Sequence, residues 1–438
     1  MPAKHSWAFK SHLRTGAFGW NGSHLACFRL KEAVAEIEKA AKSDPVAAAG
    51  GVVALMERIW PAFQHVDTSS GALGGTVVWA QSELLPILIS APADCKTREK
   101  WLGRLWQAVQ DDGVSYLSMV EERWGEICGS PAVASAWADK LLAAVRKSFS
   151  DSRSFRLFAG TTICLSSLLA AGRHQDLLDT LALLSFPFWH DRQFGVKALL
   201  AEGRPEDALG YIEASRRPNQ TGAELDAACE RILLDLGRVD EAFEKYAFTA
   251  NIASTGLSTY RAIRKKYPSR DPREILTRLA HSSGEPGRWF AAAKDAGLLG
   301  LAMEFAQTGR TDPRTLARAC RDFLQSDPRF SLEIGRLAIQ RILEGHGYEI
   351  TFQDVNDAFI HLAAAAHRLS AWPQTRDSLL AMAAEAVQRH SQFAATIMHL
   401  CSSEPAAAPI GPSVNLSQKP PAVRKLLIPR KSARRRTP

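Results

Sequence analysis

The residues best suited to binding or catalysis occur together in one ten-residue segment, Phe186–Gly195. This segment contains four aromatic rings, an imidazole, a carboxylate and a guanidinium. One interpretation is a recognition site, in which an aromatic anchor sits beside a guanidinium that grips a carboxylate or phosphate. The other is structural, with the phenylalanines in the core and the His-Asp pair bonded at a helix start. The sequence leaves both open, and the first predicts three partner-binding residues, Trp189, His190 and Arg192.

Acidic residues form a second candidate group. They are Asp111, Asp112, Glu121, Glu122 and Glu126. Paired carboxylates can transfer protons where a cleft and a perturbed pKa support them. A solvated acidic face is the structural alternative. The spacing also predicts that Glu122 and Glu126 share one helix face, because they are four residues apart.

Established catalytic motifs are absent from the sequence. It contains no Gly-x-x-x-x-Gly-Lys-Ser/Thr phosphate loop, no Gly-x-Ser-x-Gly nucleophile turn and no His-Glu-x-x-His zinc pair. His361 and His367 are six residues apart, an interval that does not suit one helix face. We therefore predict no catalytic residue, no metal site and no cofactor.

Cysteine usage and hydropathy suggest a compartment. The seven cysteines are odd in number, far apart and without a Cys-x-x-Cys pair, which fits a reducing environment. Three of them, Cys164, Cys229 and Cys320, lie in apolar helical stretches and are expected to be buried. No apolar run approaches the length of a membrane span. We therefore expect a cytoplasmic protein that does not cross a membrane.

The formal charge of +8 is concentrated at the two ends of the chain. Residues 419–438 carry eight basic residues and no acid, and residues 1–31 carry five basic residues and no acid. The tail can contact the phosphates of nucleic acid or anionic lipid, or it can be a solubilising tail without a partner. The tail residues predicted to contact phosphate or an acidic surface are Arg424, Lys425, Arg430, Lys431, Arg434, Arg435 and Arg436.

Three stretches in the middle of the chain are nearly the same, namely Leu168–Leu178, Leu199–Leu209 and Leu233–Phe243. Their Gly-Arg pairs recur at intervals of 31 and 34 residues. Such a period is typical of stacked helical hairpins, each too small to bury its own apolar face. Alanine and leucine are abundant and alternating strand patterns are scarce, so the chain is predicted to be all-α.

Helix boundaries are well marked in the sequence. Asp-Pro pairs predict helix starts, because the carboxylate accepts first-turn N–H groups and proline suits the first helical position. Glycines after apolar runs predict helix ends. The arginine after each repeated glycine is expected to bond the last carbonyls of the preceding helix, with ligand binding as the alternative. Repeated units are expected over about 155–325, and residues 328–400 are expected to form three further helices.

Three segments are predicted along the chain. They are an N-terminal helical domain over 1–150, helical repeats over 151–402 and a disordered Pro-rich basic tail over 403–438. The first domain is expected to continue into the repeats. Aromatic residues near the start are expected to pack as a cap, namely Trp7, Phe9, Phe18 and Trp20.

The Gly-Arg-x-x-Asp/Glu-Ala-Leu/Phe units resemble tetratricopeptide-type repeats, although they lack the early Trp-x-x-Leu-Gly-x-x-Tyr signature of that family. Most of residues 1–400 is also similar to an uncharacterised bacterial family, with Gly347–Thr351 among the shared landmarks. The first resemblance implies a right-handed α-solenoid, and the second implies a bacterial cytoplasmic protein and no particular reaction.

Two functions follow from these observations. The first is a non-enzymatic scaffold that presents a concave helical surface to a peptide or a partner protein. The second is a nucleic-acid-associated accessory protein whose basic ends contact phosphates. Salt dependence distinguishes them, because phosphate contacts release counterions and weaken steeply with salt.

Overall fold

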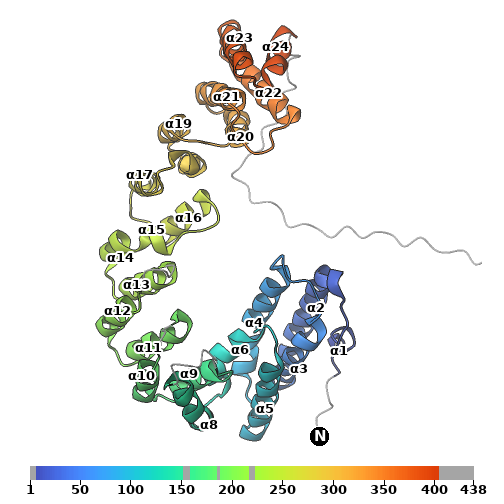
Figure 1. Ribbon diagram of the computed structural model, residues 1–438, viewed down its shortest axis with the longest axis vertical. Helices are drawn as coiled ribbons and strands as arrows, with labels where there is room; N and C mark the ends of the chain where they lie inside the picture. The colour runs from blue at the N-terminus through green and yellow to red at the C-terminus, as the bar shows by residue number, and fades with distance from the viewer. Residues whose placement is uncertain (1–5, 151–157, 185–187, 217–221, 404–438) are drawn as a thin grey trace, which may run out of the picture. The chain divides into compact units, whose positions relative to one another are not determined.

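The computed structural model describes residues 6–150, 158–184, 188–216 and 222–403. Within these residues the chain is all-α, as predicted, and contains helices and turns without a strand (Figure 1). Its contacts divide it into two compact units, Met1–Ile252 and Ala253–Pro438. Each unit is built almost entirely from helices that follow one another along the chain.

The first half of the first unit consists of long helices joined by short turns. The helices are α1 Phe9–His12, the 3-10 turn Trp20–Gly22, α2 Ser23–Ala41, α3 Pro45–Phe63, α4 Ala72–Ser90, α5 Cys95–Asp111, α6 Ser118–Glu122, α7 Trp124–Ile127 and α8 Pro131–Ser150. α2, α3 and α4 pack against one another, and α5 packs against α3. One hydrophobic core runs from Trp7 to Ala198 and so crosses the predicted boundary after residue 150.

The predicted aromatic cap is correct for three of its four residues. Trp7, Phe9 and Phe18 are 6, 3 and 5% exposed. The ring of Trp7 lies directly on α3, where a Cβ at Gly51 would come within 2.4 Å of it. Trp20, in contrast, is 68% exposed, so its ring points to solvent and contributes little to the cap.

The second half of the first unit holds the repeated stretches. Its helices are α9 Thr161–Ala170, α10 His174–Ala182, α11 Trp189–Ala201, α12 Pro205–Glu213, α13 Ala223–Asp235, α14 Val239–Lys245 and α15 Ala247–Ala250. α9 contacts α8, α10 and α11, and α11 contacts α10 and α12. α13 contacts α12, α14 and α15. Each helix is therefore covered by its near neighbours in sequence.

The turns at the three repeated glycines have the same geometry. At the first, the N–H of Arg173 donates to the Leu168 carbonyl at 3.0 Å and the N–H of Gly172 donates to the Leu169 carbonyl at 3.1 Å. These two bonds define the Schellman motif, whose left-handed residue favours glycine. The φ angles are +70° at Gly172, +71° at Gly203 and +73° at Gly237. The prediction that helices end at these glycines is confirmed.

The side chain of the arginine after each glycine bonds carboxylates rather than the last carbonyls of the preceding helix, contrary to expectation. Arg173 donates to Asp176, three residues later in its own helix, and to Asp139 in α8. Arg238 likewise pairs with Glu241 in its own helix and with Glu206 in α12. The carbonyls are already satisfied by the Schellman bonds, so the guanidinium is available to link neighbouring helices.

The second unit also consists of successive helices, and its α-helices have 6 to 17 residues. They are α16 Gly256–Lys266, α17 Pro272–Ser283, the 3-10 turn Pro286–Trp289, α18 Phe290–Asp295, α19 Leu299–Thr308, α20 Pro313–Phe323, α21 Pro328–Leu343, α22 Phe352–Arg368, α23 Trp372–Gln388 and α24 Ala394–Ser402. α20 contacts α22, α21 contacts both α19 and α23, and α22 contacts α24. Residues 328–400 thus hold four helices rather than the three expected.

The predicted helix starts are confirmed at the Asp-Pro pairs. Asp312 accepts the N–H of Thr315 at 3.0 Å, and Asp327 accepts the N–H of Phe330 at 3.0 Å. The remaining two pairs behave in the same way, with caps at Asp44 and Asp271. Cys164, Cys229 and Cys320 are buried, as predicted, and all seven cysteines are free thiols.

Two helices bear on the membrane prediction. α3 and α4 are long and apolar enough to cross a membrane, judged by length and composition alone. In the folded protein, 61% of the most apolar 18-residue segment of α3 is buried, compared with 39% of the corresponding segment of α4. Core helices of globular proteins share this composition, so the test is weak evidence for a span. The expectation of no membrane span stays a prediction.

The Schellman turns give a direct test of backbone strain. A Cβ at Gly203 meets nothing within 4 Å, so Gly203→Ala changes only the backbone energy. Because φ is +71°, we expect the free energy of unfolding to fall by about 1 kcal/mol in urea denaturation. Gly210 in α12 is the matched control, since its site is equally open and its backbone is helical. Gly210→Ala should raise stability by about 0.5–1 kcal/mol, and equal effects at both sites would contradict the turn geometry.

Candidate functional site

The three predicted partner-binding residues lie on the first turn of α11, but they point in different directions. Trp189 is half-buried and packs against the apolar cluster that includes Leu199 and Ile212. Of the nearby phenylalanines, Phe194 is 1% exposed and Phe188 is 50% exposed. Trp189 therefore contributes to packing, and its partner-binding role stays a prediction.

His190 on α11 contacts side chains of two other helices, α9 and α6. Its Nε2 lies 3.1 Å from the hydroxyl of Thr162 on α9, and its Nδ1 lies 3.5 Å from a carboxylate oxygen of Glu122 on α6. Glu122 and His190 are 68 residues apart, so no local pattern in the sequence connects them. The structure thus brings the two candidate groups, aromatic and acidic, together at one place.

Arg192 faces α12. Its Nη1 donates to the hydroxyl of Ser215 at 3.4 Å, and its guanidinium lies over the ring of Tyr211 with 5.2 Å to the ring centroid. Its Nε is buried and has no acceptor among the described residues. The contacts with Ser215 and Tyr211 thus already engage Arg192 within the protein. The neighbouring Asp191 is 4% exposed, and burial raises its pKa.

The acidic group does not form one helix face. The helix breaks at Arg123, between α6 and α7, so the prediction that Glu122 and Glu126 share a helix face is wrong. Glu126 pairs with Arg123 at 2.6 Å. Asp112 instead shapes the turn before α6, where it accepts the N–H groups of Val114 and Leu117 at 3.2 and 2.8 Å.

Glu121 has the most perturbed carboxyl of this group. Burial raises its pKa from 4.5 to about 7, and the charges of Asp112 and Glu122 add to the rise. On α11, burial lowers the pKa of Lys197, Glu122 and Glu126 oppose that fall, and Arg231 reinforces it. We call Glu121, Glu122, Thr162, His190 and Lys197 the α6–α11 polar cluster.

Glu121 is the member of the polar cluster whose pKa lies near neutral pH, and His190 has the contacts of a relay residue. A carboxylate on Nδ1 and a hydroxyl on Nε2 is the order of groups found in acid–base relays. Thr162 is only 9% exposed, however, so its hydroxyl has little access to a substrate. His190 is 47% exposed at its side chain and can meet a partner from solvent. The arrangement therefore suits recognition better than covalent catalysis.

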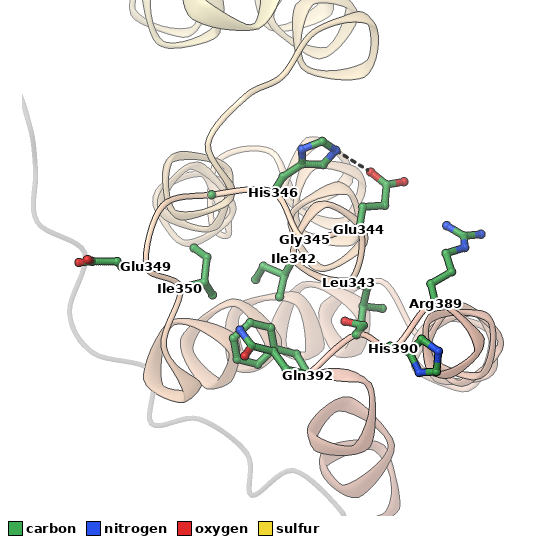
Figure 2. Close-up of a pocket in the computed structure, with 13 residues that line it drawn as sticks. Ile342, Leu343, Glu344, Gly345, His346, Glu349, Ile350, Arg389, His390 and Gln392 are labelled. Atoms are coloured by element: carbon green, nitrogen blue, oxygen red, sulfur yellow. Dashed lines mark ion pairs between the residues drawn. The ribbon is translucent and has the colours of Figure 1, made fainter.

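A separate pocket of about 680 Å³ lies in the second unit, at the C-terminal turns of α21 and α23 (Figure 2). Ile342, Ile350 and Phe393 contribute apolar surface. Polar side chains complete the lining, namely Glu344, His346, Arg389, His390 and Gln392. Figure 2 shows His346 directed toward Glu344, and their ion pair measures 3.5 Å.

One arginine holds the pocket's outer loop. Arg314 on α20 pairs with Asp354 at 2.9 Å and donates to the carbonyls of Tyr348 and Glu349 at 3.1 and 2.5 Å. This guanidinium holds the pKa of Asp354 well below its usual range. The segment it fixes is Gly347–Thr351, which is one of the landmarks named for the similarity to a bacterial family. No sequence signal indicated the pocket, because its lining comes from two segments that lie far apart in the sequence, one within Ile342–Ile350 and the other Arg389–Phe393.

The remaining predicted contact residues cannot be placed. Arg424, Lys425, Arg430, Lys431, Arg434, Arg435 and Arg436 lie outside the described residues, as does the tail after Ser403. Among the described residues, no group of three or more His, Cys, Asp or Glu side chains is arranged to hold a metal ion.

Comparison with protein-family models, curated proteins and solved structures gives no match. The tetratricopeptide-type resemblance and the similarity to a bacterial family therefore stay predictions.

The pKa of Glu121 predicts how stability changes with pH. A carboxyl whose folded pKa is above its unfolded pKa favours folding when protonated, so its contribution is lost as pH rises from about 4.5 to about 7. Glu121→Gln removes the energetic cost of holding a charged carboxylate at this buried site. We expect the variant to gain about 1–3 kcal/mol over the wild type at pH 8 and little at pH 4, measured by urea denaturation. Glu126→Gln, at an exposed paired site, should show no such gain.

The loop held by Arg314 predicts a local change in hydrogen exchange. Arg314→Met removes four bonds and should cost on the order of 2 kcal/mol of local stability, since bonds to charged groups are the stronger kind. Amides of residues 348–354 should exchange faster, while those of α17 should not change. Arg318→Met is the control one turn later, where the side chain is exposed and bonds the Arg314 carbonyl and the Thr315 hydroxyl rather than a carboxylate. Equal exchange in both variants would contradict the role of Arg314.

Proposed function

We propose that this chain is a non-enzymatic interaction scaffold, a right-handed α-solenoid that presents a long helical surface to a peptide or partner protein. Three features support the proposal. Successive helices contact their near neighbours, the turns between them share one geometry, and the strongest chemical sites are surfaces and a pocket rather than a reaction centre. A helical stack of this kind offers extended binding surface.

One observation carries the proposal, namely that arginine–carboxylate pairs recur over about one repeat length. They join residues 34, 32, 34 and 40 positions apart, at Arg173–Asp139, Arg238–Glu206, Arg261–Asp295 and Arg314–Asp354. The repeated glycines are 31 and 34 positions apart. A pair with this separation links one helix pair to the next, which is what a stacked array requires.

The pocket in the second unit is the best candidate for an anchoring side chain. Its apolar surface from Ile342, Ile350 and Phe393 suits an aliphatic or aromatic group, and its polar rim can fix the orientation of a peptide backbone. The exposed imidazole of His190, within the α6–α11 polar cluster, is the candidate in the first unit. A cytoplasmic location, expected from the cysteine pattern, is part of the same proposal.

Peptide display tests the scaffold proposal directly. Random linear peptides selected on the full chain should yield a family of sequences with a common apolar anchor, and fluorescence anisotropy should give micromolar binding. Arg389→Glu with His390→Glu changes the pocket rim, and Arg376→Glu on α23 is the control at an exposed site. The rim variant should weaken binding about tenfold and the control should not.

A failure to select binding peptides would contradict the scaffold proposal. Equal binding by the rim variant and its control would exclude only the pocket as the binding site. In the latter case, His190→Ala with Lys197→Ala tests the α6–α11 polar cluster in the same assay. The variants change exposed or half-buried side chains, so circular dichroism should remain that of the wild type.

The nucleic-acid alternative needs a separate measurement. Residues 6–31, which the structure describes, contain four basic residues and no acid, and the basic tail adds eight more charges. If this function holds, duplex binding should fall steeply with salt and should be abolished when residues 404–438 are removed. Peptide binding should survive the same truncation. Duplex binding with a flat salt dependence would rule the alternative out.

A further inference from the structure

Helix α11 separates two hydrophobic clusters of the first unit. Phe194 and Ala198 belong to the large core that begins at Trp7. Val196 and Leu199 belong to a smaller cluster, which α11 shares with α12 and α13. Because an α-helix turns by about 100° per residue, these two pairs lie on opposite sides of α11. The two clusters have no residue in common, so the apolar core of the first unit divides at this helix.

Arginine–carboxylate pairs connect the helices on both sides of α11. Before it, Arg146 of α8 pairs with Asp176 of α10 at 3.0 Å. After it, Arg216, which follows α12, pairs with Asp226 of α13 at 2.6 Å. A guanidinium keeps its charge and presents several N–H groups to a carboxylate, so these pairs are directional links between neighbouring helices.

Imidazoles connect α11 to the helices before it. His190, in its first turn, lies 3.1 Å from the Thr162 hydroxyl of α9 and 3.5 Å from a Glu122 oxygen of α6. His174 of α10 lies 3.3 Å from a carboxylate oxygen of Glu202, which directly follows α11. Among the described residues, no arginine or lysine of α11 pairs with a carboxylate of another helix. Since an imidazole offers each partner a single nitrogen, both ends of α11 are held by single contacts.

A buried carboxylate lies on the side of α11 that belongs to the large core. Asp191 is three residues before Phe194 and seven before Ala198, so it shares their side of the helix. Asp191 is 4% exposed and has no hydrogen-bond or ion-pair partner among the described residues. Burial raises its pKa, although His190 opposes the rise. A buried acid without a partner costs free energy in the packed state, so it favours opening of this contact.

We propose that α11 is a joint, at which the pair α11–α12 detaches reversibly from α6, α9 and α10. The contacts of His190 and His174 break on opening, and Asp191 gains water. The pair moves as one piece, because the Schellman bonds at Gly203 and the smaller cluster hold α11 to α12. The open form is a minor state of the folded protein, reached without unfolding the large core. This inference goes beyond the scaffold proposal and does not depend on it.

Native-state thiol labelling of the full chain, resolved by peptide mass spectrometry, tests the joint. Ala198→Cys places a probe on the side of α11 that opens, where Ala198 is fully buried. Val196→Cys is the matched probe on the opposite side, which stays covered by α12. Cys164 in α9 and Cys229 in α13 are buried internal controls. Relative to its rate in the unfolded chain, the Ala198→Cys thiol should be labelled about tenfold or more faster than the other three, with a weaker dependence on urea.

Variants at the joint should change the labelling of this probe alone. In the Ala198→Cys background, His174→Ala with His190→Ala should speed labelling about tenfold, because contacts of the closed form are lost. Asp191→Asn should slow labelling severalfold, because it removes the buried acid from the closed form. His65→Ala is the control at an exposed site without a hydrogen bond among the described residues, and it should leave the rate unchanged.

Two results would overturn the joint. If the Ala198→Cys thiol is labelled at the rate and urea dependence of Cys164, the first unit opens only as a whole. If it is labelled fast but equals the Val196→Cys thiol, or responds to neither the histidine variants nor Asp191→Asn, the opening is not the detachment of α11–α12.

Discussion

Each helix in this chain is covered mainly by helices close to it in sequence, and this constraint governs the rest of the structure. The main packing partners of a helix lie no more than three elements away along the chain. A helix of nine to thirteen residues, such as α10 or α11, cannot bury its own apolar face and needs the next pair to do so. Stability must therefore accumulate from neighbour to neighbour.

Such local packing makes the turn between helices decisive. A Schellman motif satisfies the last carbonyls of one helix and, one residue later, starts the next, so the two helices leave the turn at a fixed angle. The bonds at Gly172, Gly203 and Gly237 match within a few tenths of an ångström. Because the backbone satisfies itself, the side chain of the following arginine is left to contact a different helix.

Features set by a few adjacent residues could be predicted from the sequence. Glycine at a positive φ angle and aspartate before proline both act within one turn, and the helix ends and starts they mark agree with the structure. The same geometry at Ser370 and His390 was not foreseen, because these turns take φ angles of +54° and +58° without a glycine. Both turns lie within residues 328–400, where three helices were expected and the structure has four.

Features that depend on a neighbouring helix could not be predicted in the same way. Whether a tryptophan is exposed depends on which helix covers it. Trp189 is half-buried, whereas Trp20, which was expected to pack in the cap, is 68% exposed. The contact of Glu122 with His190 and that of Arg314 with Asp354 cross 68 and 40 residues. Only the packed structure brings such groups within bonding distance.

Local packing also has a consequence for how the surfaces of this protein can act. Energetic coupling between sites needs a connected, two-state element that both sites bias. The α6–α11 polar cluster has such a link at hand, because His190 bonds both α6 and α9. A displacement of the His190 side chain alters contacts among three helices of the first unit at once. Arg314 holds the loop that borders the pocket at α21 and α23. Binding in this pocket should therefore change mainly the stability of the second unit. Substitutions at the two places share no partner, and their effects on stability should add.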